Sequence, residues 1–159
     1  MKTLLFIKPF LILIVALFIA LPYGVEGGEY LLIDLGTLGG SESYAQDVND
    51  SRQVTGRSQI ASGDAHAFIW NSQQGMQDIG TLGGANSNGL GINNNGEVTG
   101  WSQIASSGAS HAFYYDGNAM HDLGAMSGIN SGGQGINDNA SISGTIFFDN
   151  DTHQALVLQ

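Results

Sequence analysis

A seven-residue motif returns along the chain at a fixed spacing. Asp34–Gly40 reads DLGTLGG, and Asp78–Gly84 reads DIGTLGG 44 residues later. The same step leads to Asp122–Gly128, which reads DLGAMSG. Three occurrences on one period indicate a chain built from one unit of 44 residues that is used nearly three times.

Further landmarks keep the same step or stay close to it. The pairs are Val48–Asn49, Ile92–Asn93 and Ile136–Asn137, and the triplets are Val54–Gly56, Val98–Gly100 and Ile142–Gly144. A His-Ala-Phe triplet at His66–Phe68 returns one residue late at His111–Phe113 and decays to His153–Ala155. We expect the following to be structural residues of the repeat: Asp34, Asp78, Asp122, His66, His111, Asn49, Asn93 and Asn137.

The sequence pattern of each unit predicts four short strands and no helix. In the first unit they cover about Ser43–Asn49, Gln53–Gln59, His66–Asn71 and Gly75–Leu82, and each alternates in character. The turns are rich in Asn and Gly, which tolerate positive φ, and Gly makes up 24 of the 159 residues. We therefore predict an all-β fold of tandem four-stranded antiparallel units that is β-propeller-like, with a β-solenoid as the alternative.

The strand count predicts how the chain ends meet. Tyr30–Leu38 has the pattern of a fourth strand that precedes any first strand, whereas the third unit stops after its third strand at Ala155–Leu158. The units then span about 41–84, 85–128, and 129–159 plus 29–40. Propellers have roughly four to eight blades, so three blades predict an open arc or half of a dimeric ring. The homodimer is the favoured interpretation, because an open arc leaves sheet faces uncovered.

The N-terminus has the pattern of a targeting segment. Lys2 and Lys8 form a basic segment before an apolar run, Phe10–Leu21. This run is short for a membrane span of about 20 residues. We expect a signal peptide over residues 1–27 and a secreted or cell-surface protein, with an uncleaved anchor as the alternative. Beyond residue 27 the chain carries thirteen acidic residues and two arginines, a balance that disfavours a nucleic-acid partner. No cysteine is present.

The combined motifs resemble a known bacterial family. DLGTLGG, then Val-Asn-Asp or Ile-Asn-Asn with Val-Thr-Gly, then His-Ala-Phe-Ile-Trp, is similar to the HAF family of extracellular repeats. The resemblance covers about residues 30–158. It implies export, tandem repetition and a β-rich fold, and it implies no enzymatic activity.

The polar repeat residues have a structural and a chemical interpretation. Imidazoles are common metal ligands, but one His per blade diverges from its equivalents, so we expect each to bond within its own blade. The three repeated Asp residues are expected to cap the Gly-rich turns that follow them. No metal site is predicted, and Ca²⁺ at the oxygen-rich segments Asn93–Glu97 or Asp149–Asp151 is the weaker interpretation beside hairpin turns.

A small set of residues remains as tentative ligand-binding candidates: Trp70, Trp101, Tyr114, Tyr115 and Asp47. Aromatic residues could stack on an extracellular glycan or on a protein, or could pack between blades. Asp47 breaks the repeat symmetry, since Gly91 and Gly135 stand at its equivalents. The leading hypothesis is a non-catalytic binding or scaffold module, with no catalytic residue assigned. The alternatives are a secreted hydrolase or lyase with a site in a central opening, and a purely structural surface protein.

Overall fold

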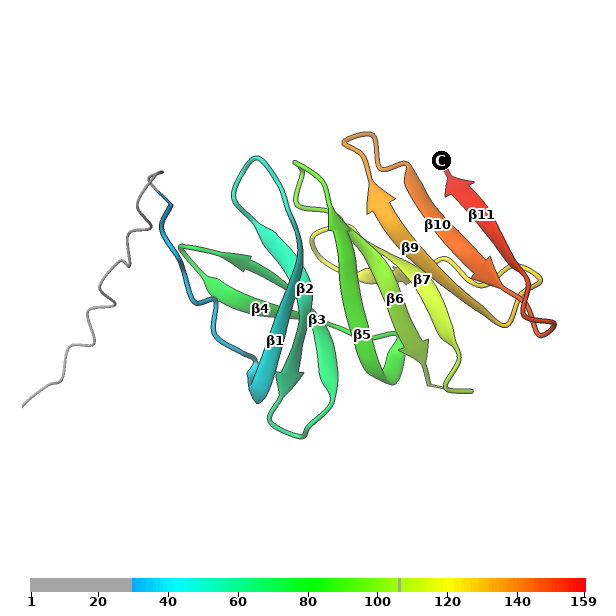
Figure 1. Ribbon diagram of the computed structural model, residues 1–159, viewed down its shortest axis with the longest axis horizontal. Helices are drawn as coiled ribbons and strands as arrows, with labels where there is room; N and C mark the ends of the chain where they lie inside the picture. Colours follow the sequence, from blue (N-terminus) through cyan, green and yellow to red (C-terminus); the bar gives the residue numbers. More distant parts are fainter. Residues whose placement is uncertain (1–29, 106) are drawn as a thin grey trace, which may run out of the picture. The chain divides into compact units, whose positions relative to one another are not determined.

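The computed structural model describes residues 30–105 and 107–159 (Figure 1). The chain divides into two compact parts, Met1–Asp34 and Leu35–Gln159, and the fold described below is that of the second part. The expected signal segment, residues 1–27, lies outside the described residues. Within the described ranges no helix is long and apolar enough to cross a membrane.

The fold consists of three antiparallel sheets, which confirms the all-β expectation. Sheet 1 contains, in order, β1 (Gly39–Val48), β2 (Val54–Ile60), β3 (Ala65–Asn71) and β4 (Gly75–Gly80). Sheet 2 contains β5 (Gly83–Ile92), β6 (Val98–Ile104), β7 (Ser110–Tyr115) and β8 (Met120–Asp122). Sheet 3 contains β9 (Asn130–Ile136), β10 (Ile142–Phe147) and β11 (His153–Leu158), with β10 in the middle.

An asparagine fixes the first hairpin turn of every sheet. The Asn49 side-chain oxygen accepts the backbone N–H of Gln53 at 2.8 Å, and Asn93 and Asn137 accept equivalent bonds from Glu97 and Ser141. The residue two positions before the second strand of each sheet has positive φ: 60° at Arg52, 80° at Gly96 and 58° at Ala140. Glycine is used at only one of these three turns, and Arg52 and Ala140 adopt the left-handed conformation in turns that the asparagine bond also closes.

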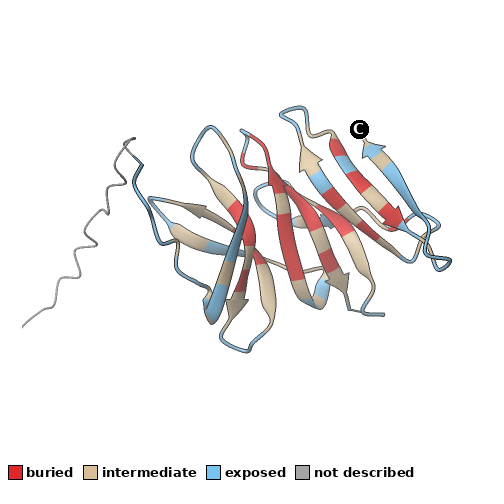
Figure 2. Cartoon of the chain, viewed as in Figure 1, coloured by how far each residue is buried: buried red, intermediate tan, exposed pale blue. Residues whose placement is uncertain are grey.

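The sheets pack face to face, with sheet 2 between the other two (Figure 1). We call the contact of sheets 1 and 2 the first junction and that of sheets 2 and 3 the second junction. Ala67 from β3 packs against Ile92, Val98 and Phe113 of sheet 2, and Phe113 is completely buried. Burial of such a side chain contributes roughly 2–3 kcal/mol. Figure 2 shows that the buried residues concentrate in the central strands, whereas most of β11 is exposed.

Glycine is required where the strands of neighbouring sheets approach most closely. A Cβ added at Gly89 of β5 would lie 2.2 Å from the Oγ1 of Thr55 in sheet 1. A Cβ at Gly133 of β9 would lie 2.0 Å from the Oγ1 of Thr99 in sheet 2. Each threonine hydroxyl is itself buried and donates to a backbone carbonyl, of Phe68 or Phe113, at 2.8 Å. At both junctions, a threonine hydroxyl held by a hydrogen bond thus lies against a glycine of the neighbouring sheet.

The expected strand at Tyr30–Leu38 does not form. Residues 30–37 are outside any strand. Leu38 forms an isolated parallel bridge to Ile60 and donates its backbone N–H to Ser58 Oγ before β1 begins at Gly39. A strand needs a neighbour to satisfy its backbone groups, and sheet 3 accordingly has three strands among the described residues instead of four.

The register of sheet 3 also corrects the expected decay of the His-Ala-Phe triplet to His153–Ala155. His66 is paired with Ser58, and His111 with Ser102. The corresponding pair in sheet 3 is Gln154 with Ile146. Gln154, and not His153, therefore occupies the position of the repeated histidine, because the turn before β11 shifts the sequence by one residue.

Candidate functional site

Hydrogen bonds between residues 44 apart join the first hairpin turns of the three sheets. Asn49 Nδ2 donates to the Asn93 carbonyl at 2.8 Å, and Asn93 Nδ2 donates to the Asn137 carbonyl at 2.9 Å. One residue further along, Asp50 N donates to Asn94 Oδ1, and Asn94 N donates to Asp138 Oδ1, both at 2.9 Å. The repeated asparagines thus connect the sheets to one another.

Two buried serines form a second set of cross-sheet bonds. Ser87 Oγ accepts from Ala67 N at 2.8 Å and donates to the Gly80 carbonyl. Ser131 Oγ accepts from Ala112 N at 2.8 Å and donates to the Gly124 carbonyl. Beside them, Asn86 Oδ1 accepts from Ala65 N at 3.0 Å, and Asn130 Oδ1 accepts from Ser110 N at 2.7 Å. These connecting residues were missed in the sequence, although their 44-residue spacing is visible there.

The repeated histidines each face an aspartate of their own sheet. His66 Nδ1 lies 2.8 Å from a carboxylate oxygen of Asp78, and His111 Nδ1 lies 2.8 Å from one of Asp122. Both aspartates also accept the backbone N–H two residues later, at 2.7 Å, from Gly80 or Gly124.

No described group of three His, Asp or Glu side chains is arranged to hold a metal ion. Asp34 is exposed and precedes Gly36, whose φ of 74° matches the 77° of Gly80. His66 and Asp78 thus bond each other within sheet 1, and His111 and Asp122 bond each other within sheet 2.

Asp47 is engaged by backbone groups. Its Oδ1 accepts from Val48 N and its Oδ2 accepts from Ile92 N in sheet 2, both at 2.9 Å. At the second junction its equivalent is Gly91, where an added Cβ would lie 3.1 Å from the Gly135 Cα. The break in repeat symmetry thus has a packing cause: the first junction uses a carboxylate where the second uses close backbone contact.

The oxygen-rich segments have protein donors. In Asn93–Glu97, the Asn93 and Tyr114 side chains donate to the Glu97 carboxylate. Asp149–Asp151 lies in the turn between β10 and β11, where Asn150 Oδ1 accepts from Thr152 Oγ1 at 2.6 Å. These contacts are those of hairpin turns.

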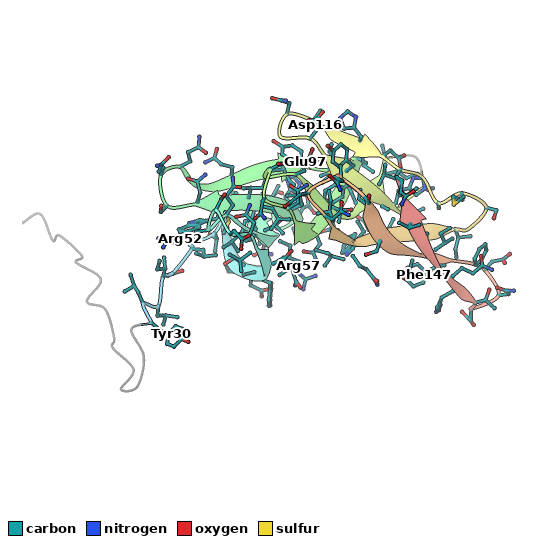
Figure 3. All side chains as sticks on the ribbon, turned by 90° about the horizontal axis from the view of Figure 1, so that it is seen from above. Tyr30, Arg52, Arg57, Glu97, Asp116 and Phe147 are labelled. Atoms are coloured by element: carbon teal, nitrogen blue, oxygen red, sulfur yellow. The ribbon has the colours of Figure 1, made fainter. Side chains whose placement is uncertain are left out.

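A titratable cluster at one edge of sheet 2 was not expected from the sequence. Tyr114 bonds Glu97 and stacks on His121 at a centroid distance of 6.0 Å, and His121 Nε2 lies 2.8 Å from Asp116. Figure 3 shows Glu97 and Asp116 near one another. The only sequence signal is that the positions equivalent to Glu97 and Tyr114 in the other two units hold neither Glu nor Tyr.

The pKa values of Tyr114, Glu97 and Asp116 move away from neutrality. The bond to Glu97, with added burial, raises the pKa of Tyr114 to about 12. The Tyr114 and Asn93 bonds lower the pKa of Glu97. The His121 bond, with backbone bonds from Ala119 and Asn118, lowers the pKa of Asp116 to about 2. The largest cause of each shift is a hydrogen bond within the cluster.

The four aromatic candidates lie in different surroundings. Tyr115 packs against the core of the first junction, and Tyr114 belongs to the cluster just described. Trp70 is half-buried in β3 between Val54 and Met76. Trp101, on β6, is half-buried and lines a hollow of about 270 Å³ at the second junction.

Small residues in sheet 3 create this hollow. Gly132 stands 44 residues after Asn88, and Thr145 stands 44 residues after Trp101. An added Cβ at Gly132 would meet only the Trp101 Cβ within 4 Å, at 3.8 Å. The hollow is lined by Leu90, Trp101, Ser110, Asn130, Ser131, Gly132, Gln134, Thr145 and Phe147. It therefore combines aromatic and aliphatic walls with several polar groups, as ligand pockets do.

One buried acceptor on the face of sheet 2 that turns toward sheet 3 has no donor among the described residues, although it does not line the hollow. Ser87 and Gly89 face sheet 1, so Asn88 between them faces sheet 3, on the same side as its paired residue Trp101. Asn88 is 6% exposed, and its Oδ1 has no hydrogen-bond partner among the described residues. A buried unsatisfied oxygen costs about 1–3 kcal/mol.

The equivalent positions at the first junction are filled differently. Arg57 replaces Trp101, and its guanidinium lies 4.8 Å from the centre of the Tyr44 ring. The hollow beside it measures about 220 Å³ and includes Glu42. A second hollow of about 390 Å³, lined by Tyr115 and mostly polar residues, lies between sheets 1 and 2.

No family model, curated protein or solved structure matches this chain.

Proposed function

We propose that this chain is an exported, non-catalytic binding module of the HAF repeat type, with its three sheets arranged as a propeller-like arc. The 44-residue cross-sheet bonds support the arc, since they relate successive sheets by the same contacts at both junctions. The low count of basic residues and the apolar N-terminal run support export and a partner other than nucleic acid.

The ligand site is the hollow at the second junction, and the ligand class is an extracellular glycan. The single observation that carries this proposal is the half-buried Trp101, which lines a hollow together with the polar residues Asn130, Gln134 and Thr145. The apolar face of a sugar ring stacks on an indole, and the amide and hydroxyl groups of Gln134, Asn130 and Thr145 can bond sugar hydroxyls. The volume of about 270 Å³ suits one sugar residue of a longer chain.

Glycan binding by the purified full-length chain tests this function, with soluble polysaccharides and an oligosaccharide array as probes. We expect Trp101→Ala to abolish binding and Trp101→Phe to weaken it. Trp70→Ala is the matched control, because Trp70 lies in sheet 1 and does not line this hollow. Binding that survives Trp101→Ala, or no binding to any glycan of the panel, would overturn the proposal.

A further inference from the structure

The outer edge of β11 lacks the neighbour that the third strands of the other sheets have. β3 pairs with β4 and β7 pairs with β8, whereas β11 pairs with β10 alone among the described strands. Most of β11 is exposed (Figure 2), and Val157 is 64% exposed. An unpaired edge offers a row of backbone donors and acceptors to another strand.

The fourth strands share a sequence that also occurs before the first sheet. Met76–Gly80 reads MQDIG, and Met120–Gly124 reads MHDLG. Leu32–Gly36, 44 residues before the first of these, reads LIDLG. Leu32 and Ile33 are 84% and 51% exposed, so this apolar segment has the residues of a fourth strand without the burial of one.

The pairing of β4 and β8 fixes the register that such a strand would take. Asp78 lies opposite Phe68, and Asp122 lies opposite Phe113. In β11 the position of these phenylalanines is taken by Leu156, which is paired with Gly144 as Phe68 is with Gly56. Asp34 therefore belongs opposite Leu156, Ile33 opposite Val157, and Leu32 opposite Leu158.

We propose that residues 32–34 of one chain add to β11 of a second copy of this chain as its fourth strand, joining the copies head to tail. Residues 32–34 cannot reach β11 of their own chain. Leu38 is bridged to Ile60 in sheet 1, and four residues span at most about 14 Å. Two face-to-face sheet separations amount to about 20 Å, and sheet 2 lies between sheets 1 and 3 (Figure 1).

The two ends of the sheet row carry complementary groups for the junction bonds. At both internal junctions the third strand donates an alanine N–H to a serine, as Ala67 does to Ser87. At the ends, the corresponding residues are Ala155 and Ser43. The bonds between turn asparagines can continue in the same way between copies. The Asn137 side chain of one copy would donate to the Asn49 carbonyl of the next.

A third junction bond would have a glutamate as its acceptor in place of an asparagine. Ala65 N and Ser110 N donate to Asn86 and Asn130. The corresponding pair at the ends is His153 N with Glu42, and a carboxylate accepts such a bond as an amide oxygen does. The acceptors of these three kinds of junction bond thus have chemical equivalents at the exposed end of sheet 1.

One position makes the junction between copies looser than the internal ones. Gly89 and Gly133 face threonine hydroxyls, but their equivalent in sheet 1 is Ala45, which would face Ser143. The added methyl group occupies space that the internal junctions leave empty. Ala45→Gly should therefore tighten the association, which distinguishes this geometry from non-specific aggregation.

A cysteine pair tests the register directly, because the natural chain has no cysteine. Ile33→Cys chains are mixed with Val157→Cys chains under mild oxidation, and cross-linked products are identified by mass spectrometry. Opposite residues of an antiparallel pair have Cα atoms about 4.5–5.5 Å apart, within disulfide reach. We expect a disulfide between the two different chains, with both sites exposed enough to leave the fold intact.

Leu32→Cys mixed with Val157→Cys is the matched control, since Leu32 points to the opposite face of the added strand. We expect at least tenfold less cross-linking in this control. Absence of an interchain disulfide with Ile33→Cys, or equal yields from the two mixtures, would overturn the proposal. Neither result affects glycan binding at Trp101, so the two proposals fail separately.

Discussion

Asn49 donates a hydrogen bond of 2.8 Å from its side-chain nitrogen to the backbone carbonyl of Asn93, 44 residues along the chain. Asn93 repeats the contact with Asn137 at 2.9 Å. Each of these asparagines also accepts a bond within its own turn. One residue type thus shapes the turn and attaches it to the next sheet, which explains how a chain with few charged residues specifies the stacking of its sheets.

Removal of the Asn93 side chain should destabilise the fold more than removal of Asn137. Asn93 is 4% exposed and donates to the next sheet, whereas Asn137 is exposed and caps only its own turn among the described contacts. We expect Asn93→Ala to lower the free energy of unfolding by about 2–4 kcal/mol and Asn137→Ala by about 1 kcal/mol. Urea denaturation measures both, and equal losses would contradict the role of the cross-sheet bond.

The glycines of the junctions should differ sharply in their tolerance of a methyl group. Gly89→Ala places a Cβ 2.2 Å from the Thr55 hydroxyl, so we expect a loss of about 1–3 kcal/mol or more. Gly132→Ala is the control, because its Cβ would meet only the Trp101 Cβ, at 3.8 Å. Thermal unfolding of both variants is the measurement. A neutral Gly89→Ala variant would mean that the sheets are not held this closely.

Acid should weaken the edge of sheet 2 through Glu97 and Asp116. Both have a lowered pKa in the folded chain, so their stabilisation is present above the usual values of 4.5 and 3.8 and is lost as the pH falls. For Asp116 the loss falls between about 4 and about 2. We expect the unfolding free energy of Asp116→Asn to change less over this range than that of the natural chain. An identical pH profile for the two proteins would refute this assignment.

Alkali should act on the same edge through Tyr114. Its pKa is raised to about 12 from a usual 10.0, so its stabilisation is complete below pH 10 and is lost as the pH rises through about 12. Tyr114→Phe removes the hydroxyl and should flatten this part of the stability profile. The absorbance of tyrosinate at high pH provides the direct titration. A Tyr114 that ionises near pH 10 in the folded chain would show that the Glu97 bond is absent.

The period and the strands could be predicted from the sequence because both are local patterns. The Asn-Asp-Ser-Arg turn and the alternation in Gln53–Gln59 locate β2 to within a residue. The register of β11 could not be predicted, since a one-residue shift in the preceding turn moves Gln154 into the place expected for a histidine. Tyr30–Leu38 has strand-like residues, but a strand forms only with a neighbour.

The candidate site was only partly predictable. Trp101 stood out as an aromatic residue, but its setting depends on Gly132 and Thr145, which lie in another sheet. The unpartnered oxygen of Asn88 depends on which face of β5 turns toward sheet 3. Asp47 stood out as an exception to the repeat. Its carboxylate accepts a hydrogen bond from the Ile92 backbone N–H, which the sequence alone does not show.

The solution mass of the full-length chain tests most directly whether the junction between sheets is used again between chains. Light scattering across a concentration series, with Ala45→Gly beside the natural chain, is the measurement. We expect the mass of two chains at high concentration and a dimer that persists at lower concentration in Ala45→Gly. The mass of a single chain at every concentration, in both proteins, would contradict the account.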